Sequence, residues 1–410
     1  MIPRTVMFQI ESSMSLKPVT LITGPRQCGK TTICLELGRR HDLSYVTLAD
    51  RTERSLARTD PEMFLSVHPA PLIVDEVQYA PMLFEAIEEA VDRRKRETGS
   101  NDGMFVLTGS QAYNVMEGVT QSMAGRVSII EMSPLSLSEI IGRDEPPFSV
   151  DFEKNIRRAM DSPMSPMDVY QTIVRGGYPE LYEKPATKTA QFYSDYVESY
   201  MERDVSEVLN VKDKDTFHRF LGYMASLTGQ EIVYEHIASD MGIDIKTVKS
   251  WISVMVSGGI VRMLHPYVPR SNTKSLTRRP KLYFRDTGLA CYLARVFDPE
   301  TLRAGYLNGP MVETFIVNEI MKTYDNNCEE TGLYYYRDSA MHEVDLVMIR
   351  DGRMTLIECK AGATYGTSSI KSFAWLGKSD FALGPSCIIC LTERAYPITK
   401  DVYALPVTSI

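Results

Sequence analysis

The pattern of apolar and polar positions divides the chain into regions of different character. Over residues 1–145, short apolar runs alternate with amphipathic stretches of helical period. The apolar runs are residues 19–22, 44–48, 72–74, 104–107 and 127–132, and the helical stretches between them are 31–40, 61–67, 83–96 and 115–123. This alternation predicts strands that are joined by helices and pair in a mostly parallel sheet.

The next region loses the apolar runs and has the pattern of helices. Pro146 and Pro147 mark a boundary. A helix is expected over residues 167–175, where two glycines end the pattern, and a long amphipathic helix over residues 190–208. Residues 146–215 are therefore expected to form a helical connector, placed to act as a lid over the first domain.

Residues 216–270 contain three helical stretches followed by a strand pattern. The helices are expected at 217–227, 233–241 and 245–257, and the strand at 260–265. This order is that of a helix-turn-helix with a wing, a winged helix.

A further α/β pattern fills residues 271–410. An amphipathic helix is expected over residues 311–324, with strands over 332–336, 343–350 and 354–359. Asp351 and Gly352 predict a tight turn that makes the last two strands a hairpin. The fold class is thus α/β and multidomain, with domains at 1–145, 146–215, 216–270 and 271–410.

A glycine-rich loop joins the first apolar run to the first helical stretch. It has the spacing Gly24-x-x-x-x-Gly29-Lys30-Thr31. Such a loop between a strand and a helix is typical of a phosphate-binding P-loop, because its glycines permit unusual backbone angles and its amides face one anion. We expect Lys30 to reach the β- and γ-phosphates of ATP and the Thr31 hydroxyl to bind Mg²⁺. The predicted nucleotide-binding residues are Gly24, Pro25, Arg26, Gln27, Cys28, Gly29, Lys30, Thr31 and Thr32.

Two adjacent acids end the third apolar run, where an open α/β sheet places its ligand chemistry. Asp75 is expected to bind Mg²⁺ through water, and Glu76 to polarise the attacking water. A polar residue at the end of the fourth run would sense the γ-phosphate or hold that water. Ser110 is preferred and Thr108 is the alternative, while a turn with no catalytic role is the competing interpretation.

Arg126 precedes the fifth run. It would supply positive charge to the transition state, in its own chain or in a neighbouring one. A surface salt bridge explains the residue equally well.

Composition changes this picture in two respects. The 410 residues carry a formal net charge of −8, which argues against wholesale coating by nucleic acid but leaves room for a local basic face. The seven cysteines are thinly spread, the start lacks an apolar signal core, and no apolar stretch approaches the roughly 18 residues of a membrane span. A reduced, cytoplasmic protein with no membrane partner is expected.

Several short motifs resemble those of one family from end to end. They are Ile2-Pro3-Arg4, residues 24–32, Asp75-Glu76-Val77-Gln78, Leu107-Thr108-Gly109-Ser110, Gly125-Arg126, Gly176-Gly177-Tyr178-Pro179, residues 283–289 and Ile357-Glu358-Cys359-Lys360. The chain resembles a family of prokaryotic AAA+-like P-loop ATPases with a C-terminal restriction-endonuclease-like domain of unknown function. The resemblance implies ATP binding and supplies no settled biological role.

A basic segment follows the predicted winged-helix core. Between residues 262 and 285 there is no acidic residue. Together with the outward lysines of the third helix, this segment would neutralise DNA phosphates in a salt-dependent manner. The predicted nucleic-acid contacts are Lys246, Lys249, Arg270, Lys274, Arg278, Arg279 and Lys281. The alternative is an exposed basic loop that pairs with acidic parts of this protein or of another copy.

The predicted C-terminal hairpin brings three polar residues to one cleft. Glu358 and Lys360 share a face of their strand, and Asp345 can meet Glu358 from the partner strand. This arrangement resembles the PD-(D/E)xK nuclease core, which implies Glu313 as a fourth member. Asp345, Glu358 and Glu313 would hold a second divalent metal, Mg²⁺ or Mn²⁺, and Lys360 would activate water or stabilise charge. Val344 stands where the family usually has proline, and a retained scaffold without activity is the alternative.

Three functions remain open from the sequence. ATP hydrolysis coupled to DNA binding or cleavage is favoured by the basic segment and the acidic constellation. A regulatory switch, in which the nucleotide state changes the surface for protein partners and no nucleic acid is cut, is favoured by the overall acidity. A signalling ATPase in a defence or toxin-linked system is the third. Control through oligomeric assembly, with Arg126 acting between subunits, is a separate expectation.

Overall fold

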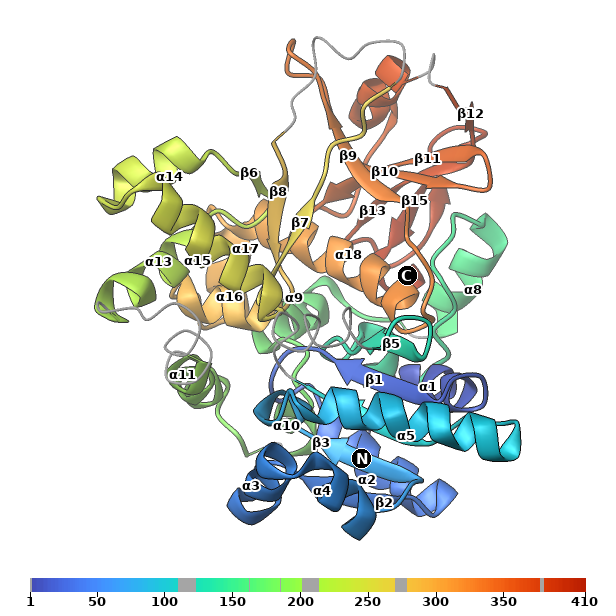
Figure 1. The fold of residues 1–410 in the computed structure, drawn as a ribbon. Coiled ribbons are helices and arrows are strands. Elements are labelled where there is room, and N and C mark those ends of the chain that lie inside the picture. Colours follow the sequence, from blue (N-terminus) through green and yellow to red (C-terminus); the bar gives the residue numbers. More distant parts are fainter. Residues whose placement is uncertain are drawn as a thin grey trace.

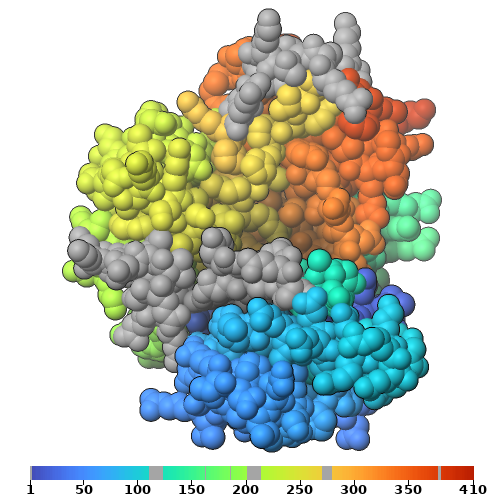
Figure 2. Space-filling view, in the orientation of Figure 1, coloured from blue at the N-terminus to red at the C-terminus, as the bar shows by residue number. Residues whose placement is uncertain are grey.

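The structure is a computed structural model that describes residues 2–109, 123–161, 163–184, 186–200, 214–269, 279–376 and 380–410. The first domain forms the lower part of the molecule in Figure 1, and the helical middle region and the C-terminal sheet lie side by side above it. Figure 2 shows the same division on the surface, from blue at the bottom to orange and red at the upper right. Within the described ranges, no helix is long and apolar enough to cross a membrane.

A five-stranded parallel sheet forms the centre of the first domain, which confirms the predicted parallel sheet. Its order is β2 (Ser44–Thr47), β3 (Leu72–Asp75), β4 (Phe105–Thr108), β1 (Val19–Thr23) and β5 (Val127–Glu131). Because β4 lies between β1 and β3, its C-terminal end lies between the ends of the two strands that carry the predicted phosphate-binding and magnesium-binding residues.

Helices cover both faces of this sheet, as buried parallel strands require. One face carries α1 (Val6–Met14) and α2 (Lys30–His41), and the other carries α3 (Arg51–Thr59), α4 (Pro61–Val67) and α5 (Leu83–Thr98). Neighbouring strand residues such as Ile73 and Val74 therefore belong to different cores. A short turn of helix, η1 (Val77–Tyr79), follows β3.

The middle region is helical. Its helices are α7 (Leu137–Ile141), α8 (Phe152–Asp161), α9 (Pro166–Arg175), α10 (Glu180–Glu183), α11 (Thr189–Tyr200), α13 (Lys214–Ser226), α14 (Tyr234–Met241) and α15 (Ile245–Ser257). Local sequence explains where α9 begins, because Ser165 and Asp168 form a capping box around Pro166. The helix predicted over residues 115–123 falls outside the described residues except for its last position.

A three-stranded antiparallel sheet completes the unit of α13, α14 and α15. Its order is β6 (Gln230–Glu231), β8 (Lys281–Phe284) and β7 (Val261–Leu264). Since β8 follows residue 271 in the chain and pairs with strands that precede it, this unit extends past the boundary that the sequence suggested.

The C-terminal region begins with α16 (Thr287–Leu293), α17 (Pro299–Ala304) and α18 (Asn308–Asp325) and ends in a mixed sheet. The strands are β9 (Leu333–Arg337), β10 (Glu343–Arg350), β11 (Arg353–Lys360), β12 (Ala382–Leu383), β13 (Ser386–Cys390), β14 (Tyr396–Pro397) and β15 (Val402–Pro406), with η3 (Thr367–Leu376) and η4 (Val407–Ser409) beside them. Their order is β14-β15-β13-β11-β10-β9, with β12 next to β11. The predicted hairpin is β10 and β11, which pair antiparallel. One group of buried apolar side chains runs from Leu137 through Tyr193 to Ile357, so the middle and C-terminal regions share a core.

Candidate nucleotide site and C-terminal cluster

The P-loop lies between the end of β1 and the start of α2. Gly24 has φ 138° and Gly29 has φ 102°, and both values lie in the region that favours glycine. A β-carbon on Gly24 would lie 2.2 Å from the carbonyl oxygen of Met132, on the segment after β5. The loop can therefore pass this segment only because residue 24 has no side chain.

Lys30 is held by the loop itself. Its Nζ donates hydrogen bonds to the carbonyl oxygens of Gly24, at 2.9 Å, and Pro25, at 2.8 Å. The residue is only 6% exposed. The ammonium group of Lys30 is therefore held next to the first two residues of the P-loop.

Asp75, at the end of β3, is surrounded by hydroxyl groups from three other elements. Its Oδ2 accepts hydrogen bonds from Thr31 Oγ1, at 3.0 Å, and from the Tyr45 phenol, at 2.9 Å, while Thr108 Oγ1 donates to Oδ1. Burial, and then the charge of Asp75, raises the pKa of Tyr45, so the phenol keeps its proton and acts as a donor. The Thr31 hydroxyl beside a carboxylate offers oxygen ligands of the kind that Mg²⁺ prefers, so the residues present fit this ion.

Glu76 follows Asp75 with a left-handed backbone, at φ 61°. A residue with a β-carbon adopts this conformation at a cost, and such residues gather at functional sites. Its backbone N–H donates to Thr108 Oγ1 at 3.1 Å, and the Gln78 amide donates to its carboxylate. Thr108 thus bridges Asp75 and Glu76, whereas Ser110, the preferred sensor, lies outside the described residues.

A polar cavity of about 520 Å³ adjoins the P-loop. One wall consists of loop and strand-end residues, and the other comes from α10, α11 and the turn before α10. The lining residues are Arg26, Gln27, Gly29, Lys30, Thr31, Thr32, Glu76, Pro179, Glu180, Glu183, Lys184 and Ser199. The helical connector therefore stands over the phosphate loop, in the place that the sequence suggested for a lid.

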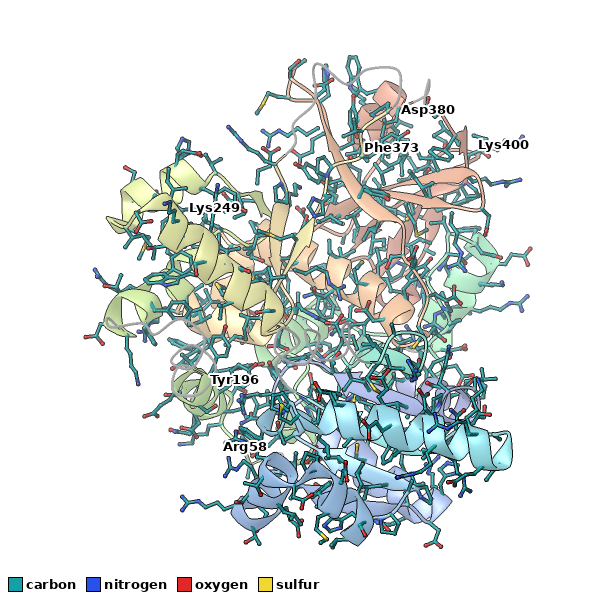
Figure 3. All side chains as sticks on the ribbon, viewed as in Figure 1. Arg58, Tyr196, Lys249, Phe373, Asp380 and Lys400 are labelled. Carbon is teal, nitrogen blue, oxygen red and sulfur yellow. The ribbon has the colours of Figure 1, made fainter. Side chains whose placement is uncertain are left out.

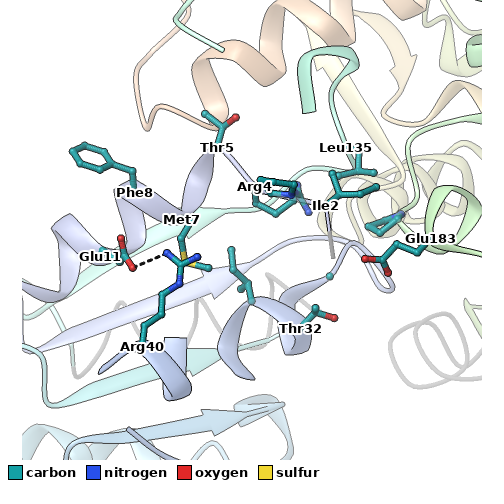
Figure 4. Close-up of a pocket in the computed structure, with 14 residues that line it drawn as sticks. Ile2, Arg4, Thr5, Met7, Phe8, Glu11, Thr32, Arg40, Leu135 and Glu183 are labelled. Carbon is teal, nitrogen blue, oxygen red and sulfur yellow. Dashed lines mark hydrogen bonds and ion pairs between the residues drawn. The ribbon is translucent and has the colours of Figure 1, made fainter. Parts of the chain in front are cut away.

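A second cavity of about 280 Å³ lies on the other side of the start of α2. Figure 4 shows it between the N-terminal segment and α2, with Ile2, Met7 and Leu135 on its walls and the Glu11–Arg40 ion pair, at 3.4 Å, at its rim. Gly29, Thr32, Pro179 and Glu183 line both cavities. An apolar and a polar cavity thus lie next to each other, with these four residues bordering both.

Arg4 connects this N-terminal segment to the loop. Its guanidinium donates to the carbonyl oxygens of Cys28 and Ser133, both at 2.7 Å, and to Glu139 Oε1 at 3.0 Å. Sequence reasoning noticed Arg4 only as part of a motif and gave no role to Tyr45 or Gln78. No local pattern marks Tyr45, because its partner lies on a neighbouring strand.

Arg126 lies away from the P-loop. It precedes β5, and its carbonyl oxygen accepts from the N–H of Val19, the first residue of β1, whereas the P-loop follows the last residue of β1. Its guanidinium contacts both carboxylate oxygens of Asp92, at 2.9 and 2.8 Å, and Glu88 at 3.0 Å. These contacts favour the salt bridge over a role of Arg126 at the phosphates of its own chain. The salt-bridge interpretation describes what it does here, and a role in a neighbouring chain stays a prediction.

The described members of the predicted nucleic-acid set differ in their exposure. Lys246 and Lys249 are exposed on α15, and Figure 3 shows Lys249 at the left of the molecule, away from the C-terminal sheet. Lys281 is only 3% exposed and pairs with Glu313 at 3.0 Å and Glu343 at 2.6 Å, so it does not face a DNA phosphate. Arg279 is exposed. Arg270, Lys274 and Arg278 lie outside the described residues.

Asp345, Glu358 and Lys360 come together as the hairpin predicts. Lys360 Nζ lies 3.0 Å from Asp345 Oδ2 and 2.6 Å from Glu358 Oε2. The Cys359 N–H donates to Asp345 at 2.8 Å, and Ser372 Oγ donates to Glu358 at 2.6 Å. Burial and then the charge of Asp345 raise the pKa of Glu358 to about 7. The pairing of β9 with β10 shifts between Val344 and Val347, which places Asp345 at an irregularity of the kind that re-aims side chains.

Glu313 makes its hydrogen bonds to residues other than these three. It lies on α18 and accepts hydrogen bonds from Lys281 Nζ, at 3.0 Å, and from the Tyr283 phenol, at 2.6 Å. In the described part of the chain, no three histidine, cysteine, aspartate or glutamate side chains are placed together to hold a metal ion. The C-terminal residues form an ion-paired cluster with Lys360 between the two acids.

Comparison with known proteins assigns part of the chain. Residues 16–141 match the AAA domain family, so the first domain is an AAA-type P-loop domain, a class that binds ATP. Residues 167–300 and 308–410 match two domains of unknown function, DUF8612 and DUF4143. Uncharacterized proteins of Mycobacterium tuberculosis and Mycobacterium bovis are each 25% identical over 403 residues, which cover 98% of this chain and 83% of theirs.

Solved structures resemble the chain only distantly. A Walker-type ATPase of Pyrococcus abyssi has 11% identity and a TM-score of 0.43, with 70% of this chain and 94% of that chain covered. A RuvB variant of Thermotoga maritima has 16% identity and a TM-score of 0.31, with 63% and 86% covered. At these TM-scores the likeness says nothing about function.

Proposed function

We propose that the chain is a magnesium-dependent ATPase whose nucleotide state controls its C-terminal part. The observation that carries this proposal is the convergence of Lys30, Thr31 and Glu76 beside one cavity, with Asp75 hydrogen-bonded to Thr31. The AAA domain match over residues 16–141 supports ATP as the nucleotide.

The two adjacent cavities suggest how ATP would lie. The adenine base of ATP would occupy the apolar cavity and its phosphates the polar cavity, since Gly29 and Thr32 at the start of α2 border both cavities. Lys30 would exchange its loop carbonyl partners for phosphate oxygens. Thr31 would hold Mg²⁺ directly and Asp75 would hold it through water. The ion would neutralise phosphate charge.

Glu76 is the residue placed to orient water. Its position after Asp75 and beside the polar cavity suits a base that polarises an attacking water molecule. The contact from Gln78 would fix the direction of its carboxylate. Hydrolysis would then depend on Glu76, while binding would depend on the P-loop.

Two substitutions separate these roles. Lys30→Ala should weaken ATP binding about 10- to 100-fold, because it removes charge-assisted hydrogen bonds to phosphate. Glu76→Gln should keep binding and lower phosphate release by about 100-fold or more. Calorimetry measures the first and a phosphate-release assay the second. Lys154→Ala, on the exposed side of α8, is the matched control. Unchanged ATP affinity in Lys30→Ala would remove the P-loop from the proposal.

DNA is the proposed partner of the middle unit. The order α13, β6, α14, α15, β7 and β8 supports a winged helix, and Lys246 and Lys249 are exposed on its third helix. Binding through these lysines would weaken steeply with salt.

A second candidate function is metal-dependent cleavage of a nucleic-acid phosphodiester by a PD-(D/E)xK-like C-terminal domain. The contact of Lys360 with both Asp345 and Glu358 favours it. Asp345 and Glu358 would hold the divalent ion, Mg²⁺ or Mn²⁺, with Glu313 as a further ligand only if it exchanged its contacts with Lys281 and Tyr283. Lys360 would then be free to orient water.

Cleavage is tested with branched, single-stranded and double-stranded DNA, with Mg²⁺ or Mn²⁺, with and without ATP, and at two salt concentrations. We expect wild-type protein to cut and Glu358→Ala and Lys360→Ala to lose the activity. Ser369→Ala, in η3 and outside the cluster, serves as the control. Cutting that persisted in both cluster variants, or no cutting by the wild type, would exclude this function while leaving the ATPase proposal intact.

A further inference from the structure

Tyr45 is an aromatic residue in contact with the magnesium site of the proposed ATPase. It lies on β2, in register with Ile73 of β3, and its ring packs against the core between the sheet and α2. Its phenol crosses to the end of β3 and donates to Asp75 Oδ2 at 2.9 Å. The residue is half-buried, so part of its surface is shielded from solvent by these neighbours.

The three donors to Asp75 differ in what they can do when a cation is present. Thr31 is a predicted ligand of the ion, so its hydroxyl oxygen would bind the metal while its O–H still donates to Asp75 Oδ2. Thr108 donates to the other carboxylate oxygen and also accepts from the Glu76 N–H. Tyr45 shares Oδ2 with Thr31 but is not itself a predicted ligand, so it is the donor on this oxygen that does not depend on the cation.

A carboxylate with one donor on each oxygen has a fixed plane. Without Tyr45, Asp75 could rotate about its side-chain bond or move toward Lys30, and each alternative would compete with cation binding. Hydrogen bonds that orient a metal ligand typically change metal affinity or activity about 10- to 100-fold when they are removed.

We propose that Tyr45 is a positioning residue for Mg²⁺·ATP, which acts by holding Asp75 toward the cation. This inference rests on the proposed ATPase function. It assigns to β2 a direct part in the site, alongside β1, β3 and β4.

The competing role is packing alone. The ring of Tyr45 fills space beside Leu43 at the edge of the core. Tyr45→Phe keeps the ring and removes only the phenol oxygen, so it separates the two roles. Tyr223→Phe is the matched control. It removes a phenol on α13 that also donates to a carboxylate, that of Asp240 on α14, and both residues are far from the P-loop in the sequence.

The test measures binding of a non-hydrolysable ATP analogue by calorimetry, first with EDTA and then over a range of Mg²⁺ concentrations. In Tyr45→Phe we expect the affinity with EDTA to match the wild type. Mg²⁺ should increase the affinity for the analogue, and the Mg²⁺ concentration that gives half of this increase should be about tenfold higher than in the wild type. Phosphate release should show the same shift, with kcat largely recovered at high Mg²⁺. Tyr223→Phe should behave as wild type in each measurement.

Other outcomes overturn the inference or its premise. A wild-type Mg²⁺ dependence in Tyr45→Phe would show that the phenol does not position Asp75. Equal loss of affinity with and without Mg²⁺ would assign Tyr45 to packing. If Tyr45→Phe fails to fold, Thr108→Val supplies the second test, since it removes the donor on the other oxygen of Asp75. A Mg²⁺ dependence equal to wild type in that variant would contradict the idea that these hydrogen bonds orient Asp75. If the wild type binds no nucleotide at all, the ATPase proposal itself fails.

Discussion

Glu145 is a carboxyl group buried where the first domain meets the end of α18. The residue is only 4% exposed, and its Oε2 accepts a hydrogen bond from Asn326 Nδ2 at 2.7 Å. Burial, and then the negative charge of Glu139, raise its pKa to about 7. Glu319 adds further negative charge, while Arg143 and Arg158 are the cations nearby.

This raised pKa gives the protein a predictable response to pH. The unfolded carboxyl titrates near its usual value of 4.5 and the folded one near 7, so the folded state holds the proton more tightly. The resulting stabilisation is complete below about pH 4.5 and is lost as the pH rises through 7. Glu145→Gln, which cannot ionise, should therefore gain stability relative to wild type by about 2 kcal/mol between pH 5.5 and pH 8.

Urea unfolding at the two pH values measures this difference. Glu153→Gln is the control, because the Glu153 side chain is exposed on α8 and should show the same difference from wild type at both pH values. A difference for Glu145→Gln that stayed constant with pH would mean that Glu145 is ionised in the folded protein throughout this range.

At the scale of elements, the sequence predicted best what depends on local periodicity. The helices expected at 217–227, 233–241 and 245–257 correspond to α13, α14 and α15, and the strand at 72–74 corresponds to β3. Each of these segments shows its own apolar stripe or run, so no distant residue is needed to recognise it. The P-loop was equally accessible, because all of its residues are consecutive.

Pairing between distant segments was not accessible in this way. Arg262, Lys281 and Arg285 read as members of an exposed basic run, yet each faces an acid from another part of the chain: Asp325, Glu313 and Glu131, respectively. The charge of a residue is visible in a sequence, whereas its partner is fixed by the topology. For the same reason β8 could not be assigned to the sheet of β6 and β7.

The candidate site shows the same limit. Asp75 and Glu76 were predicted because they end an apolar run, but the donors to Asp75 follow from the order β2-β3-β4. Tyr45 and Thr108 belong to the two neighbours of β3. Thr108 was named as the alternative sensor because it ends an apolar run, but its bond to Asp75 was not predicted, and nothing marked Tyr45. For Arg126 the sequence left a salt bridge and a catalytic role open, because it does not show which end of β5 adjoins the phosphates.

Across the whole molecule, α18 links the first domain to the C-terminal cluster. Near one end, Glu319 accepts from the Leu137 N–H at 2.7 Å and Lys322 donates to the Leu135 carbonyl at 2.8 Å. Near the other end lies Glu313. Glu313 and Lys322 lie about 14 Å apart along the axis at the rise of an α-helix. A rigid element thus connects the segment after β5 with the region of Lys281 and the hairpin.

The unit of α13, α14 and α15 touches the P-loop directly. A β-carbon on Gly259, at the end of α15, would lie 3.3 Å from Pro25 Cδ. A movement of the P-loop on nucleotide binding would therefore be transmitted to this unit as well as to α18.

Arg285 connects all these parts. It is buried after β8, bonds to Glu131 at the end of β5 and to Ser133 Oγ at 2.9 Å, and lies 3.9 Å from Asp325 of α18. Its charge lowers the pKa of Glu131. Glu131 is 49% exposed, and Asp325 still has its ion pair with Arg262 when Arg285 is removed. The loss in the free energy of unfolding should therefore fall at the low end of the range for buried ion pairs.

Arg285→Ala should lower the free energy of unfolding by about 3 kcal/mol, because a buried guanidinium that joins the first domain to α18 is lost. Arg126→Ala is the matched control, since it removes an arginine with two acidic partners on the surface of one domain and should cost no more than about 1 kcal/mol. Urea unfolding followed by intrinsic fluorescence and by circular dichroism measures both, and in Arg285→Ala the two signals should also separate as the domains unfold independently. Equal losses in the two variants, with coincident transitions in each, would show that Arg285 does not join the parts of the molecule.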